Sequence, residues 1–137
     1  MTTSTSGEWT RLLGTSGSEN VQALTTGSDG SIYISGKTSG DLDGQTNSGS
    51  NDAFISKYNP DGTKDWTRLL GTSRSDVGEA LTTGSDGSIY ISGTTSSNLD
   101  GQILLTSNGT LTNNVGGYIA FISKYNPDGT KDWTRLL

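Results

Sequence analysis

The stretch Ala53-Phe54-Ile55-Ser56-Lys57-Tyr58-Asn59-Pro60-Asp61-Gly62-Thr63-Lys64-Asp65-Trp66-Thr67-Arg68-Leu69-Leu70 decides the fold, because residues 120–137 repeat it at all 18 positions. The residues before it are also duplicated: residues 9–45 and 66–102 are identical at 29 of 37 positions. The spacing of the later copies is 67 residues instead of 57, because an insertion runs from Ile103 to about Tyr118. Duplication this close indicates one structural unit used twice.

Each unit predicts four short strands, and the fold class is therefore all-β. The strands are expected at 23–26, 31–35, 53–58 and 64–70, and again at 80–83, 88–92, 120–125 and 131–137. Between paired strands, Asp favours a tight turn by bonding nearby amides, Gly accepts a positive φ, and Pro presets the first corner. The turn residues are Asp29, Gly30, Pro60, Asp61, Gly62, Asp86, Gly87, Pro127, Asp128 and Gly129.

Both faces of the expected sheets carry apolar side chains. Because side chains alternate along a strand, Ile32 and Ile34 point away from Tyr33, and Phe54 points away from Ile55. A sheet with two apolar faces needs a neighbour on each side, and a radial ring of four-stranded antiparallel sheets supplies both. We expect the sheets to pack through Trp9, Trp66, Trp133, Phe54, Phe121, Ile32, Ile34, Ile89 and Ile91.

The pentapeptide Trp-Thr-Arg-Leu-Leu occurs three times, at 9–13, 66–70 and 133–137, although there are only two full units. One outer strand is therefore surplus. The expected organisation is a disordered tail at 1–8, a spare outer strand and first unit at 9–70, and a second unit at 71–137 with a loop insertion at about 103–118. In an assembly of chains, residues 9–13 or residues 133–137 could complete the second unit, and the pattern does not decide which.

Residues 52–62, 66–71 and 27–36 resemble the bacterial SBBP repeat, a β-propeller repeat family. The resemblance implies a propeller blade whose first strand lies toward the central channel and whose fourth strand is outermost. It brings no catalytic motif, and it implies a longer, surface-associated or secreted parent protein. Propellers close with four to eight blades, so two blades predict self-association, as a trimer with six blades or a tetramer with eight. A face-to-face or strand-swapped dimer is the alternative.

Composition excludes several classes of function. The net charge of −5 and the pI of about 4.4 disfavour binding to nucleic acid or an anionic membrane. The sequence has no Cys and no His, so a disulfide, a thiolate nucleophile and a Ser-His-Asp triad are excluded, and an enzyme is not expected. There is no signal-peptide pattern and no apolar run long enough for a membrane helix, so we expect a soluble chain.

The leading functional hypothesis is a non-enzymatic structural or interaction module whose partner is another copy of itself. A ligand-binding propeller that recognises carbohydrate through loops repeated in each blade is an alternative. Another is a blade stabilised by calcium, for which Asp41, Asp43 and Asn47 are the candidate ligands because oxygen donors alternate there beside a glycine. The competing interpretation of these three residues is a hydrogen-bonded connector, and no other cofactor is expected.

Overall fold

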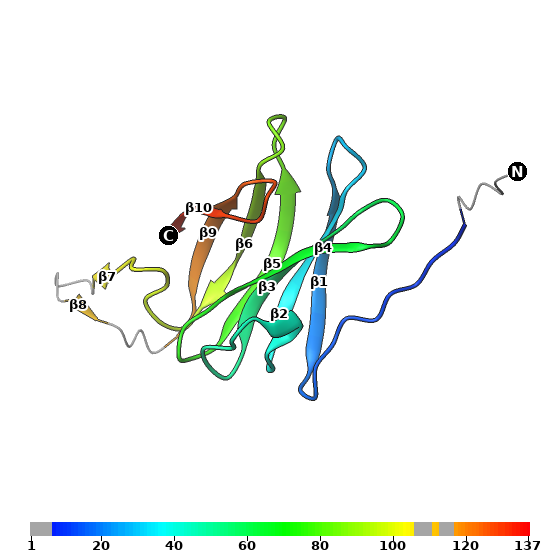
Figure 1. Ribbon diagram of the computed structural model, residues 1–137. Coiled ribbons are helices and arrows are strands. Elements are labelled where there is room, and N and C mark those ends of the chain that lie inside the picture. The colour runs from blue at the N-terminus through cyan, green and yellow to red at the C-terminus, as the bar shows by residue number, and fades with distance from the viewer. Residues whose placement is uncertain (1–6, 106–110, 113–116) are drawn as a thin grey trace, which may run out of the picture.

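In a computed structural model, which describes residues 7–105, 111–112 and 117–137, the chain folds into two four-stranded antiparallel sheets (Figure 1). Sheet 1 has the order β1 (Glu19–Thr26), β2 (Ile32–Thr38), β3 (Asp52–Tyr58), β4 (Lys64–Leu70). Sheet 2 has the order β5 (Asp76–Thr83), β6 (Ile89–Thr95), β9 (Ile119–Tyr125), β10 (Lys131–Leu136). The all-β class and the two antiparallel units are confirmed.

The first two strands of each unit are longer than predicted. β1 begins at Glu19 and β5 at Asp76, because a bulge between Val21 and Ala23, and between Gly78 and Ala80, absorbs an extra residue without ending the pairing. Gly36 allows the close approach opposite the bulge, since a Cβ there would lie 1.8 Å from the Asn20 carbonyl oxygen. The expectation that these strands begin at 23 and 80 is therefore wrong.

Hairpin turns join β1 to β2, β3 to β4, β5 to β6 and β9 to β10, and they have the expected backbone geometry. The glycines Gly30, Gly62, Gly87 and Gly129 have φ between 83° and 89°. The aspartate before each glycine accepts a hydrogen bond from the amide two residues further on, at 2.9 to 3.0 Å. Each of these bonds joins residues two apart, so it stabilises the turn locally.

Each sheet has two faces, which we name after the phenylalanine or the tryptophan that the face carries. The Phe face of sheet 1 carries Ile32, Ile34, Phe54 and Tyr58, and that of sheet 2 carries Ile89, Ile91, Phe121 and Tyr125. The Trp face of sheet 1 carries Tyr33, Ala53, Ile55, Trp66 and Leu70, and that of sheet 2 carries Tyr90, Ala120, Ile122, Trp133 and Leu137. The buried core joins the Trp face of sheet 1 to the Phe face of sheet 2.

Residues 9–13, which are expected as a spare outer strand, have no strand partner within the described part of the chain. They run beside sheet 1 (Figure 1) but form no strand among the described residues. In sheets 1 and 2 the same pentapeptide pairs with the third strand, β3 or β9, and the described part of the chain places no such strand beyond residues 9–13. Without that ladder their backbone is not held as a strand.

Other predicted segments can be placed only in part. The disordered tail expected at 1–8 lies outside the described residues for residues 1–6. In the insertion, β7 (Leu104–Leu105) pairs antiparallel with β8 (Leu111–Thr112), while residues 106–110 and 113–116 lie outside the described part. A single 3-10 turn at Leu42–Gly44 lies in the connection between β2 and β3.

Candidate functional site

The joint between the two sheets is built on the outer strand of one sheet and a turn of the next. Trp66 Nε1 in β4 donates a hydrogen bond to the carbonyl oxygen of Pro127 at 3.1 Å. Arg68 stacks over the Trp66 indole, and its Nε donates to the carbonyl of Gly129 at 2.9 Å. Lys57 Nζ in β3 adds a bond of 3.3 Å to Pro127. These three side chains, which we call the turn clamp, grip the turn from Asn126 to Gly129.

Close packing completes the clamp. A Cβ on Gly129 would lie 2.8 Å from the Trp66 ring, so the indole rests directly on the glycine backbone. Trp66 is consequently only 8% exposed. The clamp therefore needs both a glycine in the turn and a tryptophan at this position of the neighbouring outer strand.

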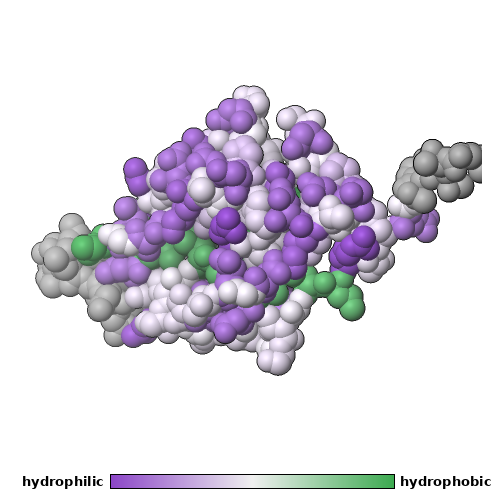
Figure 2. All heavy atoms as spheres, viewed as in Figure 1, coloured by the Kyte–Doolittle hydropathy of each residue, from purple (hydrophilic) through white to green (hydrophobic). Residues whose placement is uncertain are grey.

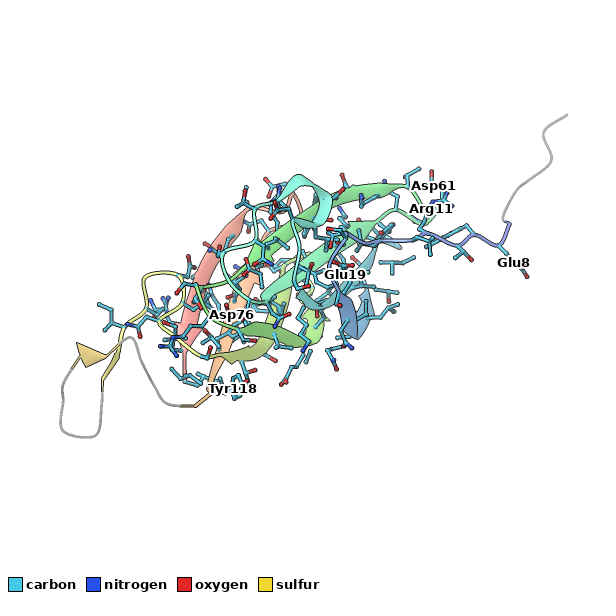
Figure 3. The ribbon with its side chains drawn as sticks, turned by 90° about the horizontal axis from the view of Figure 1, so that it is seen from below. Glu8, Arg11, Glu19, Asp61, Asp76 and Tyr118 are labelled. Carbon is cyan, nitrogen blue, oxygen red and sulfur yellow. The ribbon has the colours of Figure 1, made fainter. Side chains whose placement is uncertain are left out.

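A buried acid anchors the loop between the two sheets at the other end of the joint. The Asp76 carboxylate accepts hydrogen bonds from Thr72, in the loop after β4, and from Thr95 Oγ1 at 2.5 Å. Asp76 is fully buried, near the middle of the molecule (Figure 3), and burial raises its pKa. Glu19 holds the corresponding position in sheet 1 and accepts bonds from Thr15 and Thr38. Burial opposes ionisation of Glu19, but these hydrogen bonds outweigh it and lower its pKa.

Asp52 is a second buried acid near this joint. Its Oδ2 accepts a hydrogen bond from the Ser48 amide at 2.9 Å, whereas Oδ1 has no hydrogen-bond partner in the described part of the chain. Burial is the main cause that raises the pKa of Asp52, and the charge of Asp76 adds to it. The second unit has Ile119 at the equivalent position.

The remaining faces, the Phe face of sheet 1 and the Trp face of sheet 2, lack a second sheet within the described residues. On the Trp faces, Ala53 and Leu70 are buried but their counterparts Ala120 and Leu137 are exposed, Leu137 at 77%. On the Phe faces, Ile89 and Ile91 are fully buried, whereas Ile32 and Ile34 are partly exposed. Leu24, which lies beside Ile34, is 65% exposed. The two free faces are thus copies of the two faces that are joined.

Residues 9–13 partly cover the free Phe face of sheet 1. Trp9 Nε1 donates to the Pro60 carbonyl at 3.1 Å, and the indole stacks on Tyr58 with ring centroids 6.4 Å apart. Arg11 stacks over Trp9 and lies beside Asp61 (Figure 3). A hollow of about 390 Å³ remains between this segment and the sheet. Within the segment, Leu12 is 96% exposed, and Figure 2 shows hydrophobic residues at the surface on this side of the molecule.

The residues singled out as calcium ligands are engaged in hydrogen bonds and an ion pair. Asp41 accepts a bond from the Asn47 amide at 2.8 Å, and Asn47 Oδ1 accepts one from the Gly49 amide at 2.9 Å. Asp43 pairs with Lys64 at 2.5 Å. Within the described ranges no group of three or more Asp, Glu, His or Cys residues is arranged to hold a metal. The geometry matches that of a connector between β2 and β3.

A polar hollow of about 230 Å³ lies between equivalent turns of the two sheets. Its lining residues are Gly27, Ser28, Asp29, Tyr33, Ser85, Asp86, Gly87 and Pro127. Two turns that are far apart in the sequence therefore form one opening at the joint. A loop repeated in each unit would form such an opening at every joint of this kind.

The roles of Glu19, Asp52 and Asp76 were not predicted from the sequence. Glu19 and Asp76 do carry a signal, since an acid stands three residues after each Gly-Thr-Ser sequence at 14–16 and 71–73. Asp52 carries none, because its counterpart is apolar. Among the described residues no helix is long and apolar enough to cross a membrane.

Comparison with known proteins agrees with this architecture. The SBBP family model, described as a beta-propeller repeat, matches residues 8–43 and 65–100, together more than half of the chain. A second model, a beta-propeller domain of unknown function (DUF5122), matches residues 27–67. The chain is 31% identical over 129 residues to the regulatory protein FlaEY of Caulobacter vibrioides; the match covers 88% of this chain and 13% of the relative. Because the repeat model matches more than half of the chain, the chain belongs to the SBBP β-propeller repeat family, and its two four-stranded antiparallel sheets agree with this.

Proposed function

We propose that this chain is a non-enzymatic interaction module whose sheets act as propeller blades, and that a second copy of the chain docks on its free faces. The observation that carries the proposal is the match between free and joined faces. Residues 120–137, which supply most of the free Trp face of sheet 2, are identical to residues 53–70, which supply most of the joined Trp face of sheet 1.

The contact would be head to tail. The Trp face of sheet 2 in one copy would meet the Phe face of sheet 1 in the next, as sheet 1 meets sheet 2 within the chain. A contact between two different faces repeats from copy to copy, and it closes into a ring when the rotation allows it. With two blades in each copy, three copies would make a six-bladed ring and four an eight-bladed ring.

Exposed apolar groups supply the driving force. Burying an exposed aliphatic side chain contributes about 1.5–3 kcal/mol, and the two free faces expose Leu24 and Leu137 above half of their surface. A second turn clamp would orient the contact, since Trp133 and Arg135 already form the stacked pair that Trp66 and Arg68 form at the joint. An interaction role also fits the similarity to FlaEY, a regulatory protein.

Light scattering coupled to size exclusion tests the proposal. We expect a mass of three or four times 14.3 kDa at high protein concentration, falling on dilution. Ile122→Lys places a charge on the free Trp face, which should reduce the mass to that of one copy while the circular dichroism spectrum stays unchanged. A wild-type chain that remains a single copy at every concentration would refute the proposal.

The hollow between the repeated turns favours a second candidate, a propeller that binds carbohydrate. Asp29 and Asp86 supply carboxylate acceptors, which suit sugar hydroxyl groups. A glycan array tests this candidate, and Asp86→Ala should abolish any binding. Binding that survives this substitution would place the sugar elsewhere.

A further inference from the structure

Residues 9–13 hold the place that the outer strand of a preceding sheet would hold. Trp9 bonds Pro60 at the same distance, 3.1 Å, as Trp66 bonds Pro127. A Cβ on Gly62 would lie 2.6 Å from the Trp9 ring, as one on Gly129 would lie 2.8 Å from Trp66. The segment thus contacts the Asn59–Gly62 turn as β4 contacts the equivalent turn of sheet 2.

The loop that follows is anchored in the same way. The amide and the hydroxyl group of Thr15 both donate hydrogen bonds to the Glu19 carboxylate, as those of Thr72 do to the Asp76 carboxylate. The segment is therefore fixed at both its tryptophan and its following loop. A second copy that docks head to tail would bring its own Trp133 to the position of Trp9, and the two indoles cannot share one turn.

The two competitors differ in how firmly they are held. β10 pairs with β9 along its length, and Thr134 forms a buried hydrogen bond of 2.7 Å with Ser123. Residues 9–13 have no such ladder, and Trp9 remains 38% exposed. They also supply only part of a turn clamp. Arg11 donates to the Thr10 carbonyl as Arg68 does to the Thr67 carbonyl, but within the described residues Arg11 makes no bond to Gly62 that matches the bond from Arg68 to Gly129, and the segment has no counterpart of Lys57.

Resting on the proposed self-association, we propose that residues 9–13 are a tethered competitor that masks the docking surface until the β10 strand of a second copy displaces it. The incoming copy would bring all three clamp residues, namely Trp133, Arg135 and Lys124, to the Asn59–Gly62 turn. The segment therefore weakens association, and it sets the concentration at which copies assemble.

Two substitutions with opposite expected effects test the inference in the full chain. Trp9→Ala removes the Trp9–Pro60 hydrogen bond and the stacking on Tyr58, so association should tighten about tenfold. Lys124→Met removes the clamp residue that residues 9–13 lack, so association should weaken severalfold. The readout is the dissociation constant from sedimentation over a dilution series. Hydrogen exchange should show that β10 keeps its protection on assembly.

The outcomes separate this inference from the proposed function. If wild type associates and Trp9→Ala weakens association, residues 9–13 act as an outer strand for a neighbouring copy and the inference is overturned. An unchanged constant for Trp9→Ala, or loss of protection in β10 on assembly, also overturns it. If neither wild type nor Trp9→Ala associates at any concentration, the proposed function fails together with the inference.

Discussion

Ile55 and Ile122 stand at the same position in identical stretches of sequence, but a second sheet covers only Ile55. Ile55 is 1% exposed in the core between the sheets, whereas Ile122 lies partly exposed on the free Trp face. We expect Ile55→Ala to lower the free energy of unfolding by about 2–5 kcal/mol, the usual cost of such a cavity. At dilution, Ile122→Ala should cost only ~1 kcal/mol, because little packing is lost.

The order of the two effects reverses for association. If a second copy covers Ile122 as sheet 2 covers Ile55, completing the burial of this side chain contributes about 1–1.5 kcal/mol, or roughly tenfold in the dissociation constant. Urea denaturation at low protein concentration measures the first effect, and light scattering over a dilution series measures the second. Equal losses of unfolding free energy for the two variants would contradict the packing described here. If Ile122→Ala associates with the same dissociation constant as the wild type, docking on the free Trp face is contradicted.

Three further predictions concern the acids, the turns and the bulge. Asp52→Asn should raise the unfolding temperature at neutral pH, because the raised pKa of Asp52 means that its ionised form is less favourable in the folded chain than in the unfolded chain. The gain should shrink as the pH falls toward 3.8, where the carboxyl group becomes protonated. Asp29→Asn should show no such gain, because hydrogen bonds from Ser31 lower the pKa of Asp29. Gly129→Ala should lower the free energy of unfolding by about 1–3 kcal/mol more than Gly44→Ala does. Both glycines have positive φ, but only Gly129 lies against Trp66. Equal losses of unfolding free energy, measured by denaturant titration, would contradict this close contact. Val21→Gly should tighten association about tenfold by sedimentation. The equivalent Gly78 lies against sheet 1 at the joint, where a Cβ would be only 3.2 Å from the Gly36 carbonyl oxygen, so the larger Val21 side chain would have to be accommodated by a docking copy. Weaker association would exclude a contact like that joint.

Much of the fold follows from local sequence. The Asn-Pro-Asp-Gly and Gly-Ser-Asp-Gly turns are closed by bonds between residues two apart, such as Asp61 to the Thr63 amide, and so the hairpins could be predicted without tertiary information. The starts of β1 and β5 could not, because they depend on bulges that Gly36 and Gly93 permit by lying against the opposite backbone. The calcium candidates show a similar limit: a spacing of oxygen donors does not reveal that Lys64 pairs with Asp43.

Sequence by itself determined that the chain contains two copies of one four-stranded unit with two apolar faces and a third copy of the outer-strand pentapeptide. Tertiary structure decided what each copy does, because identical side chains meet different surroundings. Trp66 is buried against a turn of sheet 2. Trp9 is 38% exposed and lies against a turn of sheet 1, and Trp133 packs on Tyr90 at the free Trp face of sheet 2. A strand needs a partner to form a ladder, so residues 9–13, which have the sequence of a strand, are not one here.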